Sequence, residues 1–184
     1  MEKLYYKEYY TLERKHWWFT ARLHILQELL KKNIQAPFKK LCILNAGAAT
    51  GATSVMLKEF GEVTSLEYDQ DCALFLEEVL GQKVVNESLT DLTAADESFD
   101  LVCAFDVVEH IEDDTKAVQE IERVLQPEGF IYLTVPAFQL LWSEHDVINH
   151  HFRRYTRASL EKLLKDNGFE ITYSSYFNSI LFIP

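Results

Sequence analysis

Short apolar runs alternate with amphipathic stretches along most of this chain. The apolar runs have the length and composition of buried β-strands, and we expect strands at 41–45, 63–67, 99–105 and 130–135. The stretches that follow them carry apolar residues at helical spacing, and we expect helices at 52–60, 71–80, 114–125 and 159–167. Strands that alternate with helices of this length form a parallel sheet with helices on both faces. The pattern therefore predicts an α/β protein with a doubly wound, mostly parallel sheet.

The ends of the chain depart from this alternation. Residues 6–34 contain no glycine or proline, so we expect one long helix that ends before Pro37. Residues 83–86 and 170–174 are predicted to be extended. The apolar segment 178–184 is either a short last strand or the end of a truncated chain, with an interface or membrane contact as a further reading. Glycines are expected to end three of the helices, at Gly61, Gly81 and Gly168.

One strand-to-helix junction carries the clearest chemistry. Residues 41–51 read Leu-Cys-Ile-Leu-Asn-Ala-Gly-Ala-Ala-Thr-Gly, which is a buried strand, a tight turn of small residues and the start of a helix. Proteins of the α/β class use this arrangement to hold nucleotide-like ligands. About 20 residues beyond Gly47, the next strand ends on Glu67, at the spacing where an acid meets a ribose. We therefore expect a ligand that contains a ribose.

The number of glycines in this turn separates two classes of cofactor. A dinucleotide loop requires Gly-x-Gly-x-x-Gly, because the backbone must approach a pyrophosphate closely. Counting from Gly47, the second and third places are Ala49 and Ala52, whose β-carbons would crowd a pyrophosphate. A ligand that has a ribose and a small zwitterionic tail but no phosphate tolerates them better. The turn thus favours S-adenosylmethionine over NAD.

Four motifs in register resemble the class I S-adenosylmethionine-dependent methyltransferases of the bacterial small-molecule type. The turn is similar to the family's hydrophobic-Leu-Asp-x-Gly-Cys-Gly-x-Gly, with asparagine for the aspartate and alanine for the middle glycine. Glu67, followed by tyrosine and aspartate, matches the ribose acid. Ser-Phe-Asp-Leu-Val-Cys-Ala-Phe-Asp-Val-Val-Glu-His-Ile at 98–111 and Arg-Val-Leu-Gln-Pro-Glu-Gly-Phe at 123–130 complete the set. The resemblance covers roughly residues 41–135.

The resemblance implies a Rossmann-like fold whose seventh strand is short or missing. It implies a single domain in which residues 1–36 form an N-terminal helical lid and residues 37–135 form the cofactor-binding core. Residues 136–184 would then supply a substrate-side insertion and a C-terminal helix and strand.

The resemblance also implies the cofactor contacts. Glu67 would accept hydrogen bonds from the two ribose hydroxyls, with a solvated strand end as the alternative. Asp106 would pair with the ammonium of the methionine tail, or else cap the turn that follows it. The full predicted set is Asn45, Ala46, Gly47, Ala48, Gly51, Glu67, Tyr68, Ser88, Leu89, Phe105 and Asp106.

Acceptor chemistry is expected beside the reactive methyl group. Glu109 and His110 could orient the acceptor or take its proton, or they could hold their loop by local hydrogen bonds. His145 completes the predicted catalytic set. The aromatic and basic clusters at 15–22 and 136–155 resemble those of a bacterial branch of the family. They predict a substrate pocket formed by Trp17, Trp18, Trp142, His150, Arg153, Arg154 and Tyr155.

These pocket residues have structural alternatives. The tryptophans could equally pack between helices, since aromatic side chains are frequent in cores. The two arginines could bind an acidic acceptor in bidentate fashion or form structural salt bridges. The histidines at 145, 150 and 151 lack the spacing and carboxylate partner of a zinc helix, so no metal is predicted.

Composition limits the remaining classes of function. The net charge is −11, with 29 acidic and 18 basic residues, which disfavours a nucleic-acid substrate. The three cysteines have no paired spacing and are read as reduced thiols. The start of the chain lacks the apolar run of a signal peptide, and no run of 18 apolar residues occurs, so we expect a cytoplasmic protein with no membrane span.

The sequence thus predicts an enzyme that transfers a methyl group from S-adenosylmethionine to an oxygen or nitrogen nucleophile, with S-adenosylhomocysteine as the other product. The expected partner is a small-molecule substrate, and a homodimer is compatible with the sequence. The main alternative is a catalytically silent scaffold that binds either form of the cofactor. An NAD-linked oxidoreductase is disfavoured by the missing glycines, and a tRNA methyltransferase by the acidic charge. A protein methyltransferase would need an open groove.

Overall fold

The computed structural model describes residues 3–34 and 40–177 of the chain. The helices of this part are α1 (Lys3–Lys15), α2 (Trp17–Asn33), α3 (Ala52–Leu57), α4 (Gln70–Leu80), α5 (Asp114–Val124), α6 (Glu144–Ile148) and α7 (Arg157–Asp166). Its strands are β1 (Leu41–Ala46), β2 (Gly61–Leu66), β3 (Phe99–Phe105) and β4 (Leu125–Thr134). Two short 3-10 helices are η1 (Val108–His110) and η2 (Gln139–Leu141).

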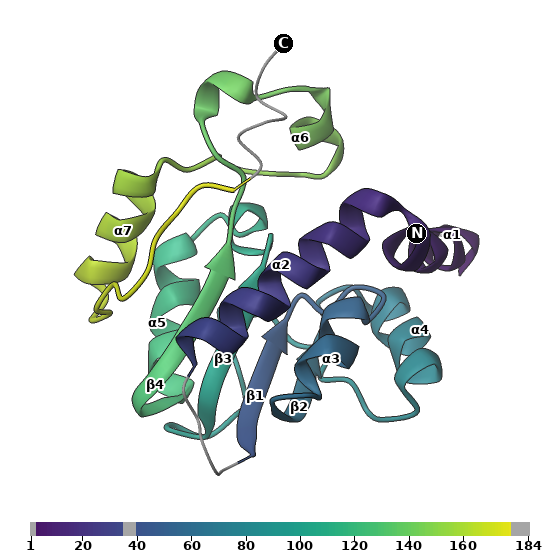
Figure 1. Cartoon of the computed structure of the whole chain (residues 1–184), viewed down its shortest axis with the longest axis horizontal. Helices are drawn as coiled ribbons and strands as arrows, with labels where there is room; N and C mark the ends of the chain where they lie inside the picture. The colour runs from purple at the N-terminus through teal and green to yellow at the C-terminus, as the bar shows by residue number, and fades with distance from the viewer. Residues whose placement is uncertain (1–2, 35–39, 178–184) are drawn as a thin grey trace.

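The strands form one sheet in the order β2-β1-β3-β4, and all neighbouring pairs are parallel. Val85 adds a parallel bridge to Leu66 at the β2 edge, where the sequence predicts an extended segment. The strand arrowheads in Figure 1 point towards the end of the molecule where α1 and α6 lie. The strand order reverses between β1 and β3, which is the position where open α/β sheets bind ligands. The predicted Rossmann-like fold is confirmed.

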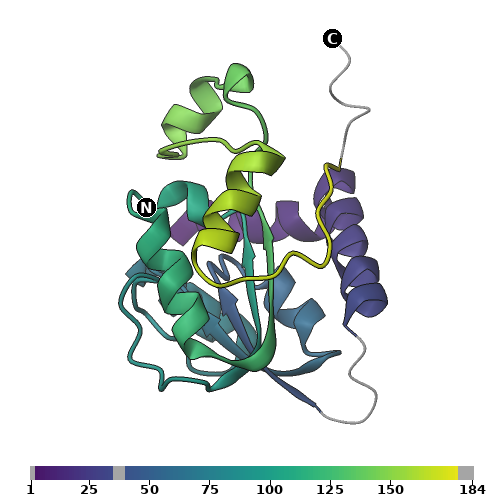
Figure 2. The same cartoon turned by 90° about the vertical axis from the view of Figure 1, so that its left-hand side faces the viewer.

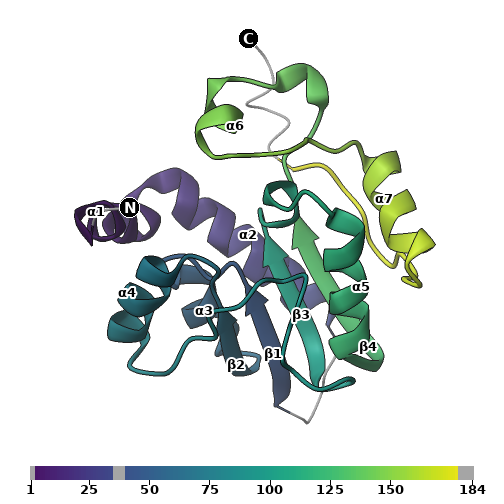
Figure 3. The ribbon, with the colours of Figure 1, turned by 180° about the vertical axis from the view of Figure 1, so that it is seen from behind.

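Helices cover both faces of the sheet because strand residues alternate between them. Leu44, Val102 and Ala104 belong to the core on the α5 side. Ile43 and Leu101 belong to the opposite core, in which α2 and α3 supply the helical residues. Figure 2 shows these two layers on either side of the strands, and Figure 3 shows α4 and α5 at opposite ends of the sheet. The doubly wound arrangement follows directly from this alternation.

The prediction of a single N-terminal helix is wrong, because the chain turns at His16 between α1 and α2. The backbone of His16 is extended, and its Nδ1 accepts a hydrogen bond from the Trp18 N–H at 3.3 Å. This side-chain cap starts α2 without a glycine or proline. The break lets α2 cross the sheet face while α1 packs near α4 (Figure 1).

Gly61 does not end a helix as predicted, because α3 stops at Leu57 and Gly61 begins β2. A β-carbon at Gly61 would lie 2.0 Å from the Leu41 carbonyl oxygen, so the glycine permits a close approach of two strands. Gly81, in contrast, ends α4 in the left-handed conformation, as predicted. A glycine therefore ends α4, while another allows β1 and β2 to pair.

The C-terminal region differs from the prediction in one respect. Residues 170–174 pair with no strand among the described residues, and this segment leaves α7 and passes to the α2 side of the molecule (Figure 2). The predicted last strand at 178–184 lies outside the described residues. Within the described segments, no helix has both the length and the apolar character needed to cross a bilayer.

Candidate active site

A cavity of about 2170 Å³ opens at the carboxyl ends of the strands. Its wall comes from α1 and α2, from the turn after β1, from η1 and from the segment that follows β4. Predicted residues in this wall are Trp18, Gly47, Ala48, Glu67, Tyr68, Ser88, Leu89, Phe105, Asp106, Glu109, His110, His145, His150, Arg154 and Tyr155. The cavity therefore unites most of the cofactor and acceptor residues that the sequence nominates.

The turn after β1 is built by close packing. Gly47 has φ +64°, and a β-carbon there would lie 2.4 Å from Cγ2 of Val107. Gly51 has φ +90°, and a β-carbon there would lie 2.7 Å from Cδ1 of Leu76. Both glycines thus combine a left-handed backbone with a crowded site. Gly47 lies in the cavity wall, while Gly51 packs behind it against α4.

Glu67 holds the turn through its carboxylate. Oε2 accepts a hydrogen bond from the Ala49 N–H at 2.9 Å, and Oε1 accepts one from the Asp69 N–H at 3.0 Å. Burial raises the pKa of the Glu67 carboxyl, against these two hydrogen bonds, which lower it. A carboxylate has about four acceptor positions, so two remain for hydroxyl donors of a ligand. The acid thus connects the ends of β1 and β2 at the cavity wall.

Asn45, Ala46 and Gly51 do not line the cavity. Asn45 is fully buried, and its Nδ2 donates to Thr53 Oγ1 at 2.9 Å and to Ser54 Oγ at 2.8 Å. Its amide therefore fastens the start of α3 to β1. This buried position suits a neutral amide better than an aspartate, because burying a charged carboxylate costs more than burying an amide.

The N-terminal helices are tied to the cofactor side of the cavity by residues that the sequence analysis missed. Glu13 accepts a hydrogen bond from the Thr50 hydroxyl, and Arg14 Nη2 donates to the Thr50 carbonyl at 3.1 Å. Tyr6 donates to Asp69 Oδ1 at 2.8 Å. The sequence signal that could have indicated these contacts is the presence of tyrosine, glutamate and arginine on an otherwise amphipathic helix. These contacts place α1 over the turn that follows β1.

Asp106 is already engaged by α2. Its Oδ2 accepts from Arg22 Nη2 at 2.6 Å, and its Oδ1 accepts from Thr134 Oγ1 at 2.9 Å. Arg22 also donates to Thr134 Oγ1 at 3.1 Å. Arg22 lies in the N-terminal cluster that the sequence singled out, but it was not among the predicted site residues. The ion pair places one positive and one negative group side by side in the cavity wall.

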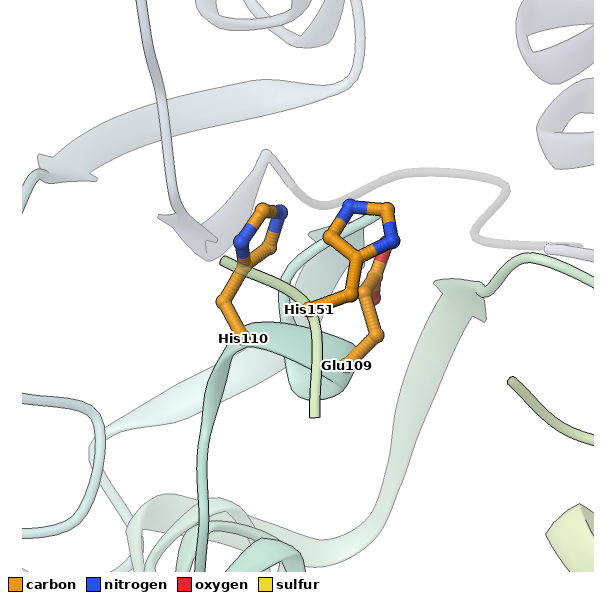
Figure 4. A group of neighbouring side chains, drawn as sticks. All are labelled: Glu109, His110 and His151. Carbon is orange, nitrogen blue, oxygen red and sulfur yellow. The ribbon is translucent and has the colours of Figure 1, made fainter. Parts of the chain in front are cut away.

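Glu109 is fully buried in η1, and neither of its carboxylate oxygens has a hydrogen-bond partner among the described residues. Burial, with the charge of Asp106, raises the pKa of Glu109 to about 9. Burial and the adjacent His151 lower the pKa of His110. The rings of His110 and His151 meet edge to face with centroids 4.5 Å apart, and Figure 4 shows all three side chains together.

Asp146 lies beside the part of the cavity where the sequence predicts acceptor residues, which we call the acceptor end. Its carboxylate is fully buried and accepts from Arg154 Nε at 2.8 Å, from Arg154 Nη2 at 2.9 Å and from the Ser143 N–H at 2.8 Å. His151 Nδ1 lies 2.9 Å from Asp146 Oδ1. Burial alone would raise the pKa of Asp146, but these hydrogen bonds hold it well below its usual range. Arg154 therefore forms a buried salt bridge as well as part of the cavity wall.

Other predicted substrate residues divide between the wall and the surface. Trp18, His145, His150 and Tyr155 lie in the cavity wall. Tyr155 donates to Asp114 Oδ2 at 2.7 Å. Trp17, Trp142 and Arg153 lie outside the wall, and Arg153 pairs with Asp114 at 2.8 Å. Trp17 is largely exposed on α2 and contacts the Trp18 ring edge to face.

A family model described as "Methyltransferase domain" matches residues 44–133, which run from β1 to β4 and include Glu67, Asp106 and η1. Residues 44–133 of this chain form a methyltransferase domain of the class I S-adenosylmethionine-dependent family. The match covers the two strand ends and the turn that form the cofactor side of the cavity. It leaves α1, α2 and most of the acceptor side of this methyltransferase outside the matched segment.

Curated relatives of the methyltransferase are distant. A ubiquinone biosynthesis O-methyltransferase of Dictyostelium discoideum is 22% identical over 182 residues, which covers 82% of this chain and 57% of the relative. A Mycolicibacterium smegmatis protein named "Probable S-adenosylmethionine-dependent methyltransferase" is 26% identical over 164 residues, covering 87% of this chain and 62% of the relative. The chain thus spans less than two thirds of the length of these relatives.

Solved structures show the same fold. A Pyrococcus horikoshii protein has a TM-score of 0.71 at 19% identity, covering 90% of this chain and 89% of the other. The [4+2]-cyclase SpnF also has a TM-score of 0.71, at 18% identity, covering 86% of this chain and 62% of the other. Since one of these proteins is named a cyclase, the fold alone does not fix the reaction.

Proposed function

We infer that this protein transfers the methyl group of S-adenosylmethionine to a nucleophilic atom of a small-molecule acceptor and releases S-adenosylhomocysteine. The observation that carries this inference is the position of Glu67. Its carboxylate holds the turn after β1, and Glu67 lines the same cavity as Glu109 and His110. The acid proposed for the ribose and the polar groups proposed for the acceptor thus line one cavity.

The charges of the cavity wall suit the zwitterionic tail of the cofactor. Arg22 and Asp106 form an ion pair at 2.6 Å. The methionine tail carries a carboxylate that would pair with Arg22 and an ammonium that would pair with Asp106. Two ion pairs with the cofactor would then replace the single Arg22–Asp106 pair. The ribose would then lie on Glu67, and the adenine beside Ser88 and Leu89. The lid function proposed for α1 and α2 follows, since Arg22 would close on the bound cofactor.

Methyl transfer asks the protein mainly for position. The sulfonium is an activated donor, so the acceptor–methyl bond forms as the sulfur–methyl bond breaks, with the two atoms in line. Enclosure by α1, α2 and α6 keeps water from the reacting atoms. When the acceptor is a hydroxyl, its proton must leave, and Glu109, His110 and His145 are the ionisable groups proposed to guide it.

Two observations narrow the acceptor. The net charge of −11 disfavours a nucleic acid. The Dictyostelium relative is named an O-methyltransferase, which favours an oxygen nucleophile over nitrogen. We therefore propose a small hydroxyl-bearing acceptor, held between Trp18 and the histidine-rich segment that follows α6.

Calorimetric titration with S-adenosylhomocysteine tests the cofactor site. Micromolar binding is expected, and Glu67→Ala should weaken it roughly 10- to 100-fold, because hydrogen bonds to a charged group are lost. The matched control is Glu62→Ala, an exposed glutamate on β2, the strand that Glu67 follows. NADH should not bind. Equal affinity in wild type and Glu67→Ala would contradict the proposed site, while cofactor binding without turnover of any hydroxyl acceptor would favour the silent scaffold.

A further inference from the structure

Two segments that lie far apart in the sequence bring a carboxylate and two imidazoles together at the acceptor end of the cavity. Glu109 and His110 come from η1, and His151 comes from the segment after α6. One ligand atom from each lies within 4.8 Å of the other two. Figure 4 shows the two rings and the carboxylate close together beside η1. A tetrahedral ion with bonds of about 2.1 Å spaces its ligand atoms roughly 3.4 Å apart, so small side-chain movements would close the set.

Glu109 lacks the partner that its position requires. The side chain is fully buried, and both carboxylate oxygens are without a hydrogen-bond donor in the part of the chain that the structure describes. A buried polar group that is left unsatisfied costs about 1–3 kcal/mol, and more when it is charged. Because Glu109 is among the residues around the cavity, a cation that enters from the cavity would reach its covered carboxylate after a small side-chain movement.

His151 is prepared for the role of ligand by Asp146. The Nδ1 atom of His151 lies 2.9 Å from Asp146 Oδ1, and Asp146 is itself fixed by Arg154. A histidine that binds a metal usually donates its other ring N–H to a carboxylate or a carbonyl. This pairing places the proton on Nδ1 and leaves Nε2 as an electron-pair donor.

We propose that Glu109, His110 and His151 bind one divalent transition-metal ion. Two imidazoles and one carboxylate suit Zn²⁺, Mn²⁺ or Fe²⁺, and three protein ligands leave a coordination position open towards the cavity. The histidine spacing within 145–151 gave no metal signal, because two of the ligands come from η1. The site deepens the proposed function and rests on it for its role, which is to bind the acceptor oxygen.

The role in the reaction follows from the charge of the ion. A hydroxyl bound to a divalent ion loses its proton more readily, and His145, which is not one of the proposed ligands, guides that proton out of the cavity. The resulting alkoxide or phenoxide then forms its bond to the methyl carbon as the sulfur–methyl bond breaks. The products are a methyl ether and neutral S-adenosylhomocysteine, so atoms and charge balance.

Metal binding is tested on the full chain, purified without a polyhistidine tag and stripped with a chelator. Equilibrium dialysis against Zn²⁺ and, separately, Mn²⁺ should give about one ion per chain for at least one of the two metals. Glu109→Gln and His151→Ala should each weaken binding by more than the roughly 100-fold that loss of an outer partner can cost. The matched control is His24→Ala, an exposed histidine on α2, which should bind like wild type.

Two further measurements keep the outcomes distinct. Thermal melts show whether each variant folds, and S-adenosylhomocysteine titration of the stripped protein reports the cofactor site alone. Cofactor binding without metal binding would overturn the metal site and leave the methyltransferase proposal standing. Metal binding without cofactor binding would support the site and contradict the proposed function. Equal metal affinity in wild type, Glu109→Gln and His151→Ala would also overturn the site.

Discussion

The two ends of the cavity are built on different physical principles. At the cofactor end, backbone groups and short-range packing dominate, because Glu67 accepts from two backbone N–H groups and Gly47 fits against Val107. At the acceptor end, charged side chains from separate segments hold one another, with Asp146 between Arg154 and His151. The first end is fixed by local conformation, and the second by tertiary ion pairs.

The two ends also differ in how their buried carboxylates are satisfied. In the cofactor end, the Glu67 carboxylate is hydrogen-bonded and the turn is closely packed. In the acceptor end, Glu109 is buried with both oxygens lacking a partner among the described residues. A common cofactor can be held by a standard cradle, whereas acceptors differ and require groups that are free to bind them. The predictions below test whether the two ends are separable.

The largest effect is expected at Asp146. Asp146→Ala leaves the half-buried Arg154 guanidinium without its buried carboxylate partner, which should lower the free energy of unfolding by about 3–5 kcal/mol. Urea denaturation measures this change. The control is Asp166→Ala, whose partner Lys162 is exposed, so the loss should be about 0–1 kcal/mol. A comparable small loss in Asp146→Ala would mean that the acceptor end does not depend on this ion pair.

A single methyl group added at Gly47 should destabilise the turn after β1, at the cofactor end of the cavity. Gly47→Ala and Gly81→Ala place the same side chain at the same φ of +64°, but only the first meets another atom, Val107 Cγ2 at 2.4 Å. Each variant carries the backbone cost of about 1–2 kcal/mol, and Gly47→Ala should lose roughly 1–3 kcal/mol more through overpacking. Thermal and urea unfolding compare them directly. Equal losses would show that backbone strain alone governs the turn.

The sequence brings Gly47 and Glu67 together because the determinants of this turn are local. Gly47 and Glu67 belong to one strand-turn-helix-strand unit, so spacing alone places them. Gly61 was misread because its constraint is a contact with Leu41, twenty positions away in the chain. The break at His16 was missed because a histidine side chain supplies the cap.

The contacts of the acceptor end could not be predicted, because they join residues that are still further apart in the chain. Tyr155 meets Asp114 across 41 positions, and His151 meets η1 across about 40. No periodicity or motif spacing encodes such pairs, since they depend on how the segment after β4 folds back over the sheet. The structural salt bridge weighed for Arg153 is observed with Asp114, while Arg154 combines a salt bridge with a place in the cavity wall.

A substitution of Arg22 tests whether α2 contributes to cofactor binding, as proposed for a lid helix. Its ion pair with Asp106 is partly exposed, so Arg22→Gln should change the free energy of unfolding by less than about 1 kcal/mol. Affinity for S-adenosylhomocysteine should fall roughly tenfold, because the charged contact to the methionine carboxylate is lost. Lys31→Gln, at an exposed position on α2, serves as the control in the same titration. Unchanged affinity would assign α2 to the acceptor end.

The smallest effect concerns the pH dependence of stability at Glu67. Burial raises its folded-state pKa above the ordinary value, so the folded protein keeps the proton more tightly than the unfolded chain. Stability from this group is therefore complete at pH values below the unfolded pKa and declines as pH rises through the folded pKa. Glu67→Gln removes that titration and should flatten the slope of unfolding free energy above about pH 4, by less than about 1.4 kcal/mol per pH unit. Urea unfolding at a series of pH values measures the slope, with Glu62→Gln on β2 as the control. A slope unchanged by Glu67→Gln would mean that the carboxylate is as well solvated by its two backbone donors as it is by water, and that the cofactor end carries no strain before the ribose arrives.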